Sequence, residues 1–203
     1  MQIITGAFNG KELSLAARLA GSRSPSRPGT RREFDFYPTP QSMVDELVCR
    51  LGWDRSLPIW EPCLGDGRMK RALEHRGYTV VGSDIATGQD FFDFNASSKP
   101  AIAICTNPPF KYIRPFIRHA FRIGIERMAL VCNERLWACK AGSAQFREHQ
   151  PSRFVNLSWR EDYLGRGPGH SPDRSLAISI WDGTAGDCVF QIWDRSDQPD
   201  LFL

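Results

Sequence analysis

The sequence predicts an α/β domain in which helices cover both faces of a mostly parallel sheet. Short apolar runs, such as Ala101-Ile102-Ala103-Ile104-Cys105, lack the polar alternation of a half-exposed strand and therefore predict strands that are buried on both faces. Segments in which apolar residues recur at helical spacing separate these runs. Strands that alternate with helices in this way are typical of βαβ units and a parallel sheet.

The expected elements follow in order from residue 39. Thr39-Pro40 begins a helix that runs to residue 51, with Met43, Leu47 and other apolar side chains on one face. The further helices are expected at residues 68–75, where Gly77 ends the helix, 112–124 and 134–149. The strands are expected at residues 59–60, 79–85, 101–106, 128–132, 153–159, 176–181 and 188–193.

The composition fits one soluble domain with a basic N-terminal segment. Of 203 residues 41% are apolar and 24% are charged, and the net charge of +3 allows nucleic-acid binding without requiring it. Residues 1–33 are rich in Ser, Pro, Gly and Arg, which predicts a flexible segment with a short helix near residues 12–20. Residues 34–203 are expected to form a single domain.

The sequence gives no sign of a metal site, a disulfide or a membrane span. The cysteines (Cys49, Cys63, Cys105, Cys132, Cys139 and Cys188) show no CxxC spacing, and the four histidines are scattered. We expect reduced core cysteines in a cytoplasmic protein. No stretch has the length of a membrane span, and the N-terminus lacks a signal-peptide pattern.

A glycine-containing loop, Glu61-Pro62-Cys63-Leu64-Gly65-Asp66-Gly67, links the first strand to the next helix. Glycines at such a turn let the backbone approach a ligand closely. The loop lacks the GxGxxG and Gly-Lys-Ser/Thr patterns of pyrophosphate and phosphate sites, and it opens with an acid. An acid here suits a ligand with a cationic group, although a plain strand–turn–helix link would also explain the glycines.

Two acids follow farther along the chain. Asp84 ends the second predicted strand, where an acid in a βαβ unit commonly accepts hydrogen bonds from ribose hydroxyls. Asp90 would accept from an adenine amino group while Phe91 packs against the ring. The structural alternatives are a helix-capping aspartate at 84 and a solvated turn with a core phenylalanine at 90–91.

The tetrapeptide Asn107-Pro108-Pro109-Phe110 follows the strand predicted at residues 101–106. Ligands of open α/β sheets bind at this carboxyl end of the strands. The prolines stiffen the loop, so the Asn107 amide and the Phe110 ring would keep a set relation and grip a planar substrate that carries an NH2 group. In isolation, a proline-rich turn with a core phenylalanine would have the same sequence.

Together these motifs resemble those of the class I S-adenosylmethionine-dependent methyltransferases, in particular the N6-adenine branch with the gamma motif order. The resemblance implies a Rossmann-like fold with a mostly parallel seven-stranded sheet, S-adenosyl-L-methionine as cofactor, and methylation of the N6 amine of adenine, in DNA rather than RNA. The matching segments are Phe36-Tyr37-Pro38-Thr39-Pro40, residues 61–67, Val81-Gly82-Ser83-Asp84, Asp90-Phe91 and Asn107-Pro108-Pro109-Phe110.

The resemblance also implies the residues of the site. Asn107, Pro108, Pro109 and Phe110 would be catalytic. The cofactor would be bound by Tyr37, Thr39, Pro40, Glu61, Cys63, Gly65, Gly67, Asp84, Ile85, Asp90, Phe91 and Asn107. The substrate would be bound by Phe110, Lys111, Arg114, Arg166 and His170.

The chain departs from large gamma enzymes in its length. Only 93 residues follow Phe110, so no separate target-recognition domain is expected. Specificity would then come from the glycine-rich residues 160–174, from the N-terminal segment, or from a second copy or another partner. The helix after the tetrapeptide carries Arg114, Arg118 and Arg122 in a stripe that would reach phosphates, with a solvated face as the default.

Three other functions stay open. RNA adenine-N6 methyltransferases would use the same four residues, and protein glutamine-N5 methyltransferases use a similar Asn-Pro-Pro-aromatic loop, usually with Tyr in the fourth place. The non-enzymatic alternative is an inactive methyltransferase-like subunit. Glu61, Gly65, Asp84 and Asn107 count against it, because an inactive copy would be free to lose them.

Overall fold

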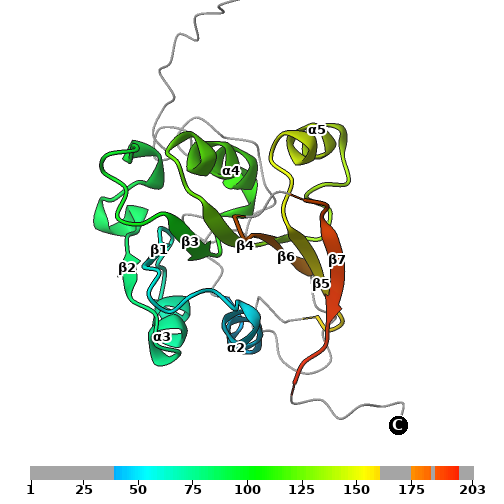
Figure 1. The fold of residues 1–203 in the computed structure, drawn as a ribbon, viewed down its shortest axis with the longest axis horizontal. Coiled ribbons are helices and arrows are strands. Elements are labelled where there is room, and N and C mark those ends of the chain that lie inside the picture. The colour runs from blue at the N-terminus through cyan, green and yellow to red at the C-terminus, as the bar shows by residue number, and fades with distance from the viewer. Residues whose placement is uncertain (1–38, 161–174, 184–185, 197–203) are drawn as a thin grey trace, which may run out of the picture.

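The computed structural model describes residues 39–160, 175–183 and 186–196. Within these residues a seven-stranded sheet carries helices on both faces (Figure 1). The expectations for the basic segment, for Tyr37 and for the loop with Arg166 and His170 concern residues 1–38 and 161–174, which lie outside the described residues.

Every helix and strand predicted from residue 39 onward is present. The helices are α2 (Gln41–Arg50), α3 (Arg68–His75), α4 (Ile113–Arg122) and α5 (Lys140–Glu148), and the 3-10 turns are η2 (Ile85–Thr87), η3 (Phe91–Asp93) and η4 (Phe110–Tyr112). The strands are β1 (Ile59–Glu61), β2 (Val80–Gly82), β3 (Ala103–Thr106), β4 (Arg127–Asn133), β5 (Arg153–Leu157), β6 (Leu176–Trp181) and β7 (Val189–Trp193).

The strand order is β2-β1-β3-β4-β6-β5-β7. Only β6 runs antiparallel to its neighbours, which confirms the mostly parallel sheet. The chain passes from β1 to β2 on one side and then to β3 on the other side of β1. The carboxyl ends of β1 and β3 therefore lie at a topological switch point, where open α/β sheets bind their ligands.

The helices form two layers, with α2 and α3 on one face and α4 and α5 on the other (Figure 1). Alternate residues of the central strands enter two separate apolar cores. On β4, Ala129 and Val131 face the core of α2 and α3, whereas Met128 and Leu130 face the core of α4. All four are buried, so the strand has no polar face, which explains its continuous apolar sequence.

The helix predicted at residues 134–149 begins only at Lys140, so its predicted start was wrong. Residues 134–139 form turns, in which Leu136 N donates to Asn133 O at 3.0 Å and Ala138 N donates to Arg135 O at 3.1 Å. Leu136 is buried in the core of α4 and Trp137 packs against that core, so their apolar character reflects burial rather than a helical face.

The prediction of core cysteines holds for two of the six. Cys105 and Cys132 are buried, Cys63 and Cys188 are half-buried, and Cys49 and Cys139 are exposed. All six are free thiols. Among the described residues, no three His, Cys, Asp or Glu side chains are placed to hold a metal ion, and no helix has the length and hydropathy needed to cross a membrane.

Candidate functional site

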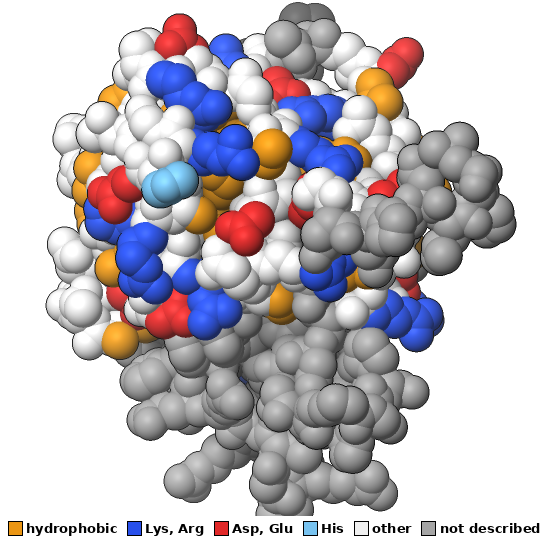
Figure 2. All heavy atoms as spheres, turned by 90° about the horizontal axis from the view of Figure 1, so that it is seen from below, with side chains coloured by type: hydrophobic (Ala, Val, Ile, Leu, Met, Phe, Trp, Pro, Cys, Tyr) orange, Lys and Arg blue, Asp and Glu red, His pale blue; other side chains and the backbone are white. Residues whose placement is uncertain are grey.

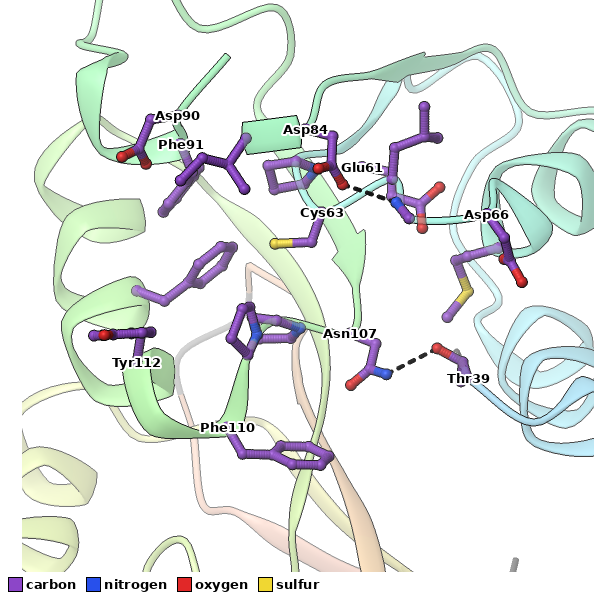
Figure 3. A pocket seen from close by; sticks show the side chains of 18 of the residues that line it. Thr39, Glu61, Cys63, Asp66, Asp84, Asp90, Phe91, Asn107, Phe110 and Tyr112 are labelled. Atoms are coloured by element: carbon purple, nitrogen blue, oxygen red, sulfur yellow. Dashed lines mark hydrogen bonds between the residues drawn. The ribbon is translucent and has the colours of Figure 1, made fainter. Parts of the chain in front are cut away.

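A pocket lies at the carboxyl ends of β1, β2 and β3, at the switch point of the sheet (Figure 3). In this view the acids lie along its upper side, and Asn107 and Phe110 lie along its lower side. Most of the residues predicted from sequence line this single pocket: Thr39, Glu61, Cys63, Gly65, Asp84, Ile85, Asp90, Phe91, Asn107, Pro108, Pro109 and Phe110.

Four predicted site residues are described but do not line the pocket. Pro40 immediately precedes α2, and Gly67 immediately precedes α3. The side chain of Lys111 is exposed, with Nζ 5.4 Å from the centroid of the Tyr112 ring. Arg114 points to the turn before α5, where it donates to Leu136 O at 3.1 Å and to Cys139 Sγ at 2.8 Å. Their roles remain predictions.

The loop between β1 and α3 takes its shape from two glycines and from Asp84. Gly65 and Gly67 have φ values of 53° and 74°, in the left-handed region that favours glycine. Gly65 N donates to Asp84 Oδ2 at 2.8 Å, and Leu64 N donates to Ser83 O at 3.1 Å. The loop after β1 is thus fastened to the end of β2, and its backbone borders the pocket.

Glu61 is a buried acid at the end of β1. Its side chain is 3% exposed, and Oε2 has no hydrogen-bond partner among the described residues. Burial raises the pKa of Glu61 to about 8, to which the negative charges of Asp66 and Asp84 contribute. A buried carboxyl group with an unsatisfied oxygen is costly, and a cationic ligand in the pocket would satisfy it.

Asp84 combines a structural role with room for a ligand. Its Oδ1 accepts from Ala86 N at 2.8 Å, which caps η2, and its Oδ2 accepts from Gly65 N. The capping aspartate considered from sequence is therefore present. Each carboxylate oxygen can accept a second hydrogen bond, so the same group can still bind hydroxyls in the pocket.

The acid and the aromatic ring beyond β2 lie where the core meets the pocket. Asp90 is buried, and its Oδ1 accepts from Phe92 N at 3.0 Å. Phe91 is stacked on Phe116, with ring centroids 3.9 Å apart, and is tilted against Trp60 at 5.3 Å. Phe91 is thus a core residue that also lines the pocket.

The Asn107 amide is held from the opposite side of the pocket. Its Nδ2 donates to Thr39 Oγ1 at 2.9 Å, across 68 positions of sequence, and Oδ1 lies on the side toward Phe110 (Figure 3). Thr39 O accepts in turn from Arg68 at 2.7 Å. Phe110 is partly buried against the core of α2 and α3. The tetrapeptide is therefore anchored both to the N-terminus of α2 and to α3.

Sequence reasoning missed several residues of the pocket wall. Arg68, Met69, Phe92 and Tyr112 also line the pocket. Tyr112 is buried, and its hydroxyl has no hydrogen-bond partner within the described parts of the chain. The only signal in the sequence was position, because each of these residues lies within two positions of a predicted motif.

No protein-family model matches the chain, and no curated protein matches it in sequence. Solved structures do match in fold. A structure described as a class I S-adenosylmethionine-dependent methyltransferase of Listeria monocytogenes has a TM-score of 0.59 and 12% identity, over 84% of this chain and 68% of that one.

Two proteins of type I restriction systems also match in fold. The type I restriction–modification methyltransferase subunit of Streptococcus thermophilus has a TM-score of 0.54 and 14% identity, over 77% of this chain and 47% of that one. The type I restriction enzyme EcoKI M protein has a TM-score of 0.52 and 12% identity, over 71% of this chain and 43% of that one. The matched part is thus less than half of either subunit. The sheet and these similarities show that the chain has the Rossmann-like fold of the class I S-adenosylmethionine-dependent methyltransferases.

Proposed function

We propose that the protein is an S-adenosylmethionine-dependent methyltransferase that methylates the N6 amine of adenine in nucleic acid, DNA in preference to RNA. The observation that carries this proposal is one shared pocket. Within it, Glu61 and Asp84, which suit the cofactor, lie across from Asn107 and Phe110, which suit a planar amine.

The pocket fits the cofactor by the chemistry of its groups. The unsatisfied Oε2 of Glu61 would accept from the ammonium of the methionine end. Asp84 would accept from the ribose hydroxyls, and Asp90 from the adenine amino group, next to Phe91. S-adenosylmethionine, when bound, supplies a methyl group on a positively charged sulfur, which is electrophilic without help from a metal ion or a protein nucleophile.

The residues on the other side would prepare the amine. The lone pair of an exocyclic amine is delocalised into the purine, so the amine is a poor nucleophile. Asn107 Oδ1 and the Pro108 carbonyl would accept its two N–H bonds and aim the lone pair, while Phe110 stacks on the base. Stacking contributes about 1–3 kcal/mol. With two hydrogen bonds it offsets the few kcal/mol that extruding a base costs.

The choice of substrate rests on two observations. Two of the structures that share the fold are modification subunits of type I restriction systems, which favours DNA. The fourth residue of the tetrapeptide is Phe rather than Tyr, which favours adenine over a glutamine side chain.

Asn107→Ala is expected to lower methyl transfer by about 10²–10³-fold, the effect of removing one hydrogen-bonding group aimed at the transition state. The measurement is transfer from labelled S-adenosylmethionine to duplex DNA, single-stranded DNA, RNA and a protein extract, with nucleoside mass spectrometry of the product. N6-methyladenine that disappears in the variant supports the proposal and identifies the substrate. Label that enters protein alone would replace it by glutamine methylation.

Thr39→Val is expected to slow transfer about 10–100-fold, because the isosteric valine cannot accept the hydrogen bond that orients the Asn107 amide. Thr39→Ser keeps the hydroxyl and should retain most of the activity. The turnover number should fall more than the cofactor affinity, which calorimetry measures. Equal activity of the Val and Ser variants would show that this hydrogen bond does not orient Asn107.

A further inference from the structure

A groove lies between α2 and α3 on the outer side of these two helices. The wall formed by α3 and the residue after it carries Arg68, Arg71, His75 and Arg76, and α2 contributes one acid, Asp45. Figure 2 looks onto this face of the molecule, where Lys and Arg side chains gather with acids among them. The groove is therefore concave and predominantly basic.

Two of these cations are not neutralised by a carboxylate. Arg68 forms an ion pair with Asp66 at 2.7 Å, and the nearby Lys70 pairs with Glu74. Arg71 and Arg76, in contrast, have no carboxylate partner among the described residues. Both side chains are exposed. Arg71 Nη1 donates to the backbone oxygen of Asp66 at 2.8 Å, which fixes the direction of its side chain without cancelling its charge.

The groove begins at the candidate active site. Arg68 lines both the groove and the pocket, and its guanidinium donates to Thr39 O, while Thr39 Oγ1 accepts from Asn107. From there the groove follows α3, whose eight residues span about 12 Å. One strand of duplex DNA presents a phosphate about every 3.4 Å along the axis, so this length matches roughly three phosphates.

The arginine stripe of α4, on the opposite face, is less suited to this role. Arg114 is bound to the turn before α5, and Arg122 Nη2 lies 2.5 Å from His119 Nδ1. Only Arg118 of the stripe is exposed without a contact of this kind among the described residues.

We propose that the groove between α2 and α3 binds the phosphate backbone of the nucleic-acid substrate next to the target base. This inference rests on the proposed function for the identity of the ligand. It assigns to Arg71 and Arg76 a part of the protein's affinity for the substrate backbone.

The test compares Arg71→Gln/Arg76→Gln with a control pair, Lys140→Gln/Arg147→Gln, which removes two exposed cations from α5 on the opposite face. Binding of a fluorescent adenine-containing duplex is followed by anisotropy over a salt series. Loss of two phosphate contacts should make the slope of log K against log salt shallower by about 1.8. The control pair should leave the slope unchanged. Thermal unfolding and S-adenosylmethionine binding, which should match wild type, verify that both variants are folded.

The inference would be overturned if the groove variant had the same slope as wild type, or if the control pair changed the slope equally. It would also be overturned if the wild-type protein bound neither the duplex nor its single strands. The proposed function fails separately: if the wild type binds with the expected slope difference but transfers no methyl group, the groove is supported and the reaction is not.

Discussion

Glu61→Gln is expected to abolish measurable binding of S-adenosylmethionine and, at the same time, to stabilise the folded protein at pH 8 and above. The buried carboxylate has an oxygen without a hydrogen-bond partner among the described residues, and burial disfavours its charged form. A neutral amide of nearly the same shape avoids that cost but loses the attraction for the ammonium group of the ligand.

The sign of the pH dependence follows from the pKa of Glu61, which is raised from 4.5 to about 8 in the folded state. Between these values the unfolded chain has lost the proton while the folded chain keeps it, so stability falls as the pH rises from about 4.5 to 8. The gain in the free energy of unfolding from Glu61→Gln should therefore be small near pH 5 and roughly 1–3 kcal/mol at pH 8. This is less than the pKa shift would give at about 1.36 kcal/mol per pKa unit, because the surroundings of a buried charge relax.

The affinity of the wild-type protein for S-adenosylmethionine should rise with pH over the range in which its folding stability falls. Because a cationic ligand requires the charged form of Glu61, its affinity should rise as the pH increases from 6 to 8, by up to about tenfold per unit. Calorimetry and denaturant unfolding at pH 5 and pH 8 measure both effects. Glu74→Gln, which removes an exposed acid of α3, is the control that should alter neither. Tight binding by the Glu61→Gln protein would remove Glu61 from the cofactor site.

Among glycine-to-alanine substitutions in the described residues, Gly142→Ala is expected to cause the largest loss of folding stability. A Cβ at this position would lie 2.2 Å from the Leu136 carbonyl oxygen and 3.0 Å from the Trp137 Cα, and both are backbone atoms. Overpacking of this kind typically costs about 1–3 kcal/mol, and a clash with backbone lies at or above the upper end. The first turn of α5 must move to relieve it.

Denaturant unfolding measures that loss. Gly186→Ala provides the control, because a Cβ at Gly186 meets no atom of the described residues within 4 Å, apart from its chain neighbours. Equal stability of the two alanine variants would contradict the close packing of α5 against the turn before it. Cofactor binding should survive in any folded fraction of Gly142→Ala, since neither Gly142 nor Leu136 lines the pocket.

The sequence predicted the strands well because six of the seven run parallel and the central ones are buried on both faces, so they appear as continuous apolar runs. It bounded α3 correctly because glycines lie at both ends, with Gly67 before it and Gly77 after it. It also brought Glu61, Asp84 and Asn107 into one site, since each follows a strand and parallel strands end at the same edge.

What the sequence did not reveal depends on packing between distant segments. The hydrogen bond from Asn107 to Thr39 joins residues 68 positions apart, and no local pattern announces it. The late start of α5 was missed because Leu136 and Trp137 are apolar for reasons of burial, while their backbone follows turns. The groove of α3 was missed because its arginines look like an ordinary solvated helix face.

The position of β6 has a consequence for how the chain acquires its structure during synthesis. β6 follows β4 and β5 along the chain but lies between them in the sheet. A nascent chain can pair β1 to β4 early, yet β4 keeps an open apolar edge, and β5 has no link to the rest, until residues 176–181 emerge from the ribosome. Vectorial synthesis therefore delivers the joining strand after both of its neighbours, and these long-range pairings make closure of the sheet a late, slow step. During that interval the unpaired edge of β4 can pair with an edge strand of another copy, which is the general hazard of incomplete sheets.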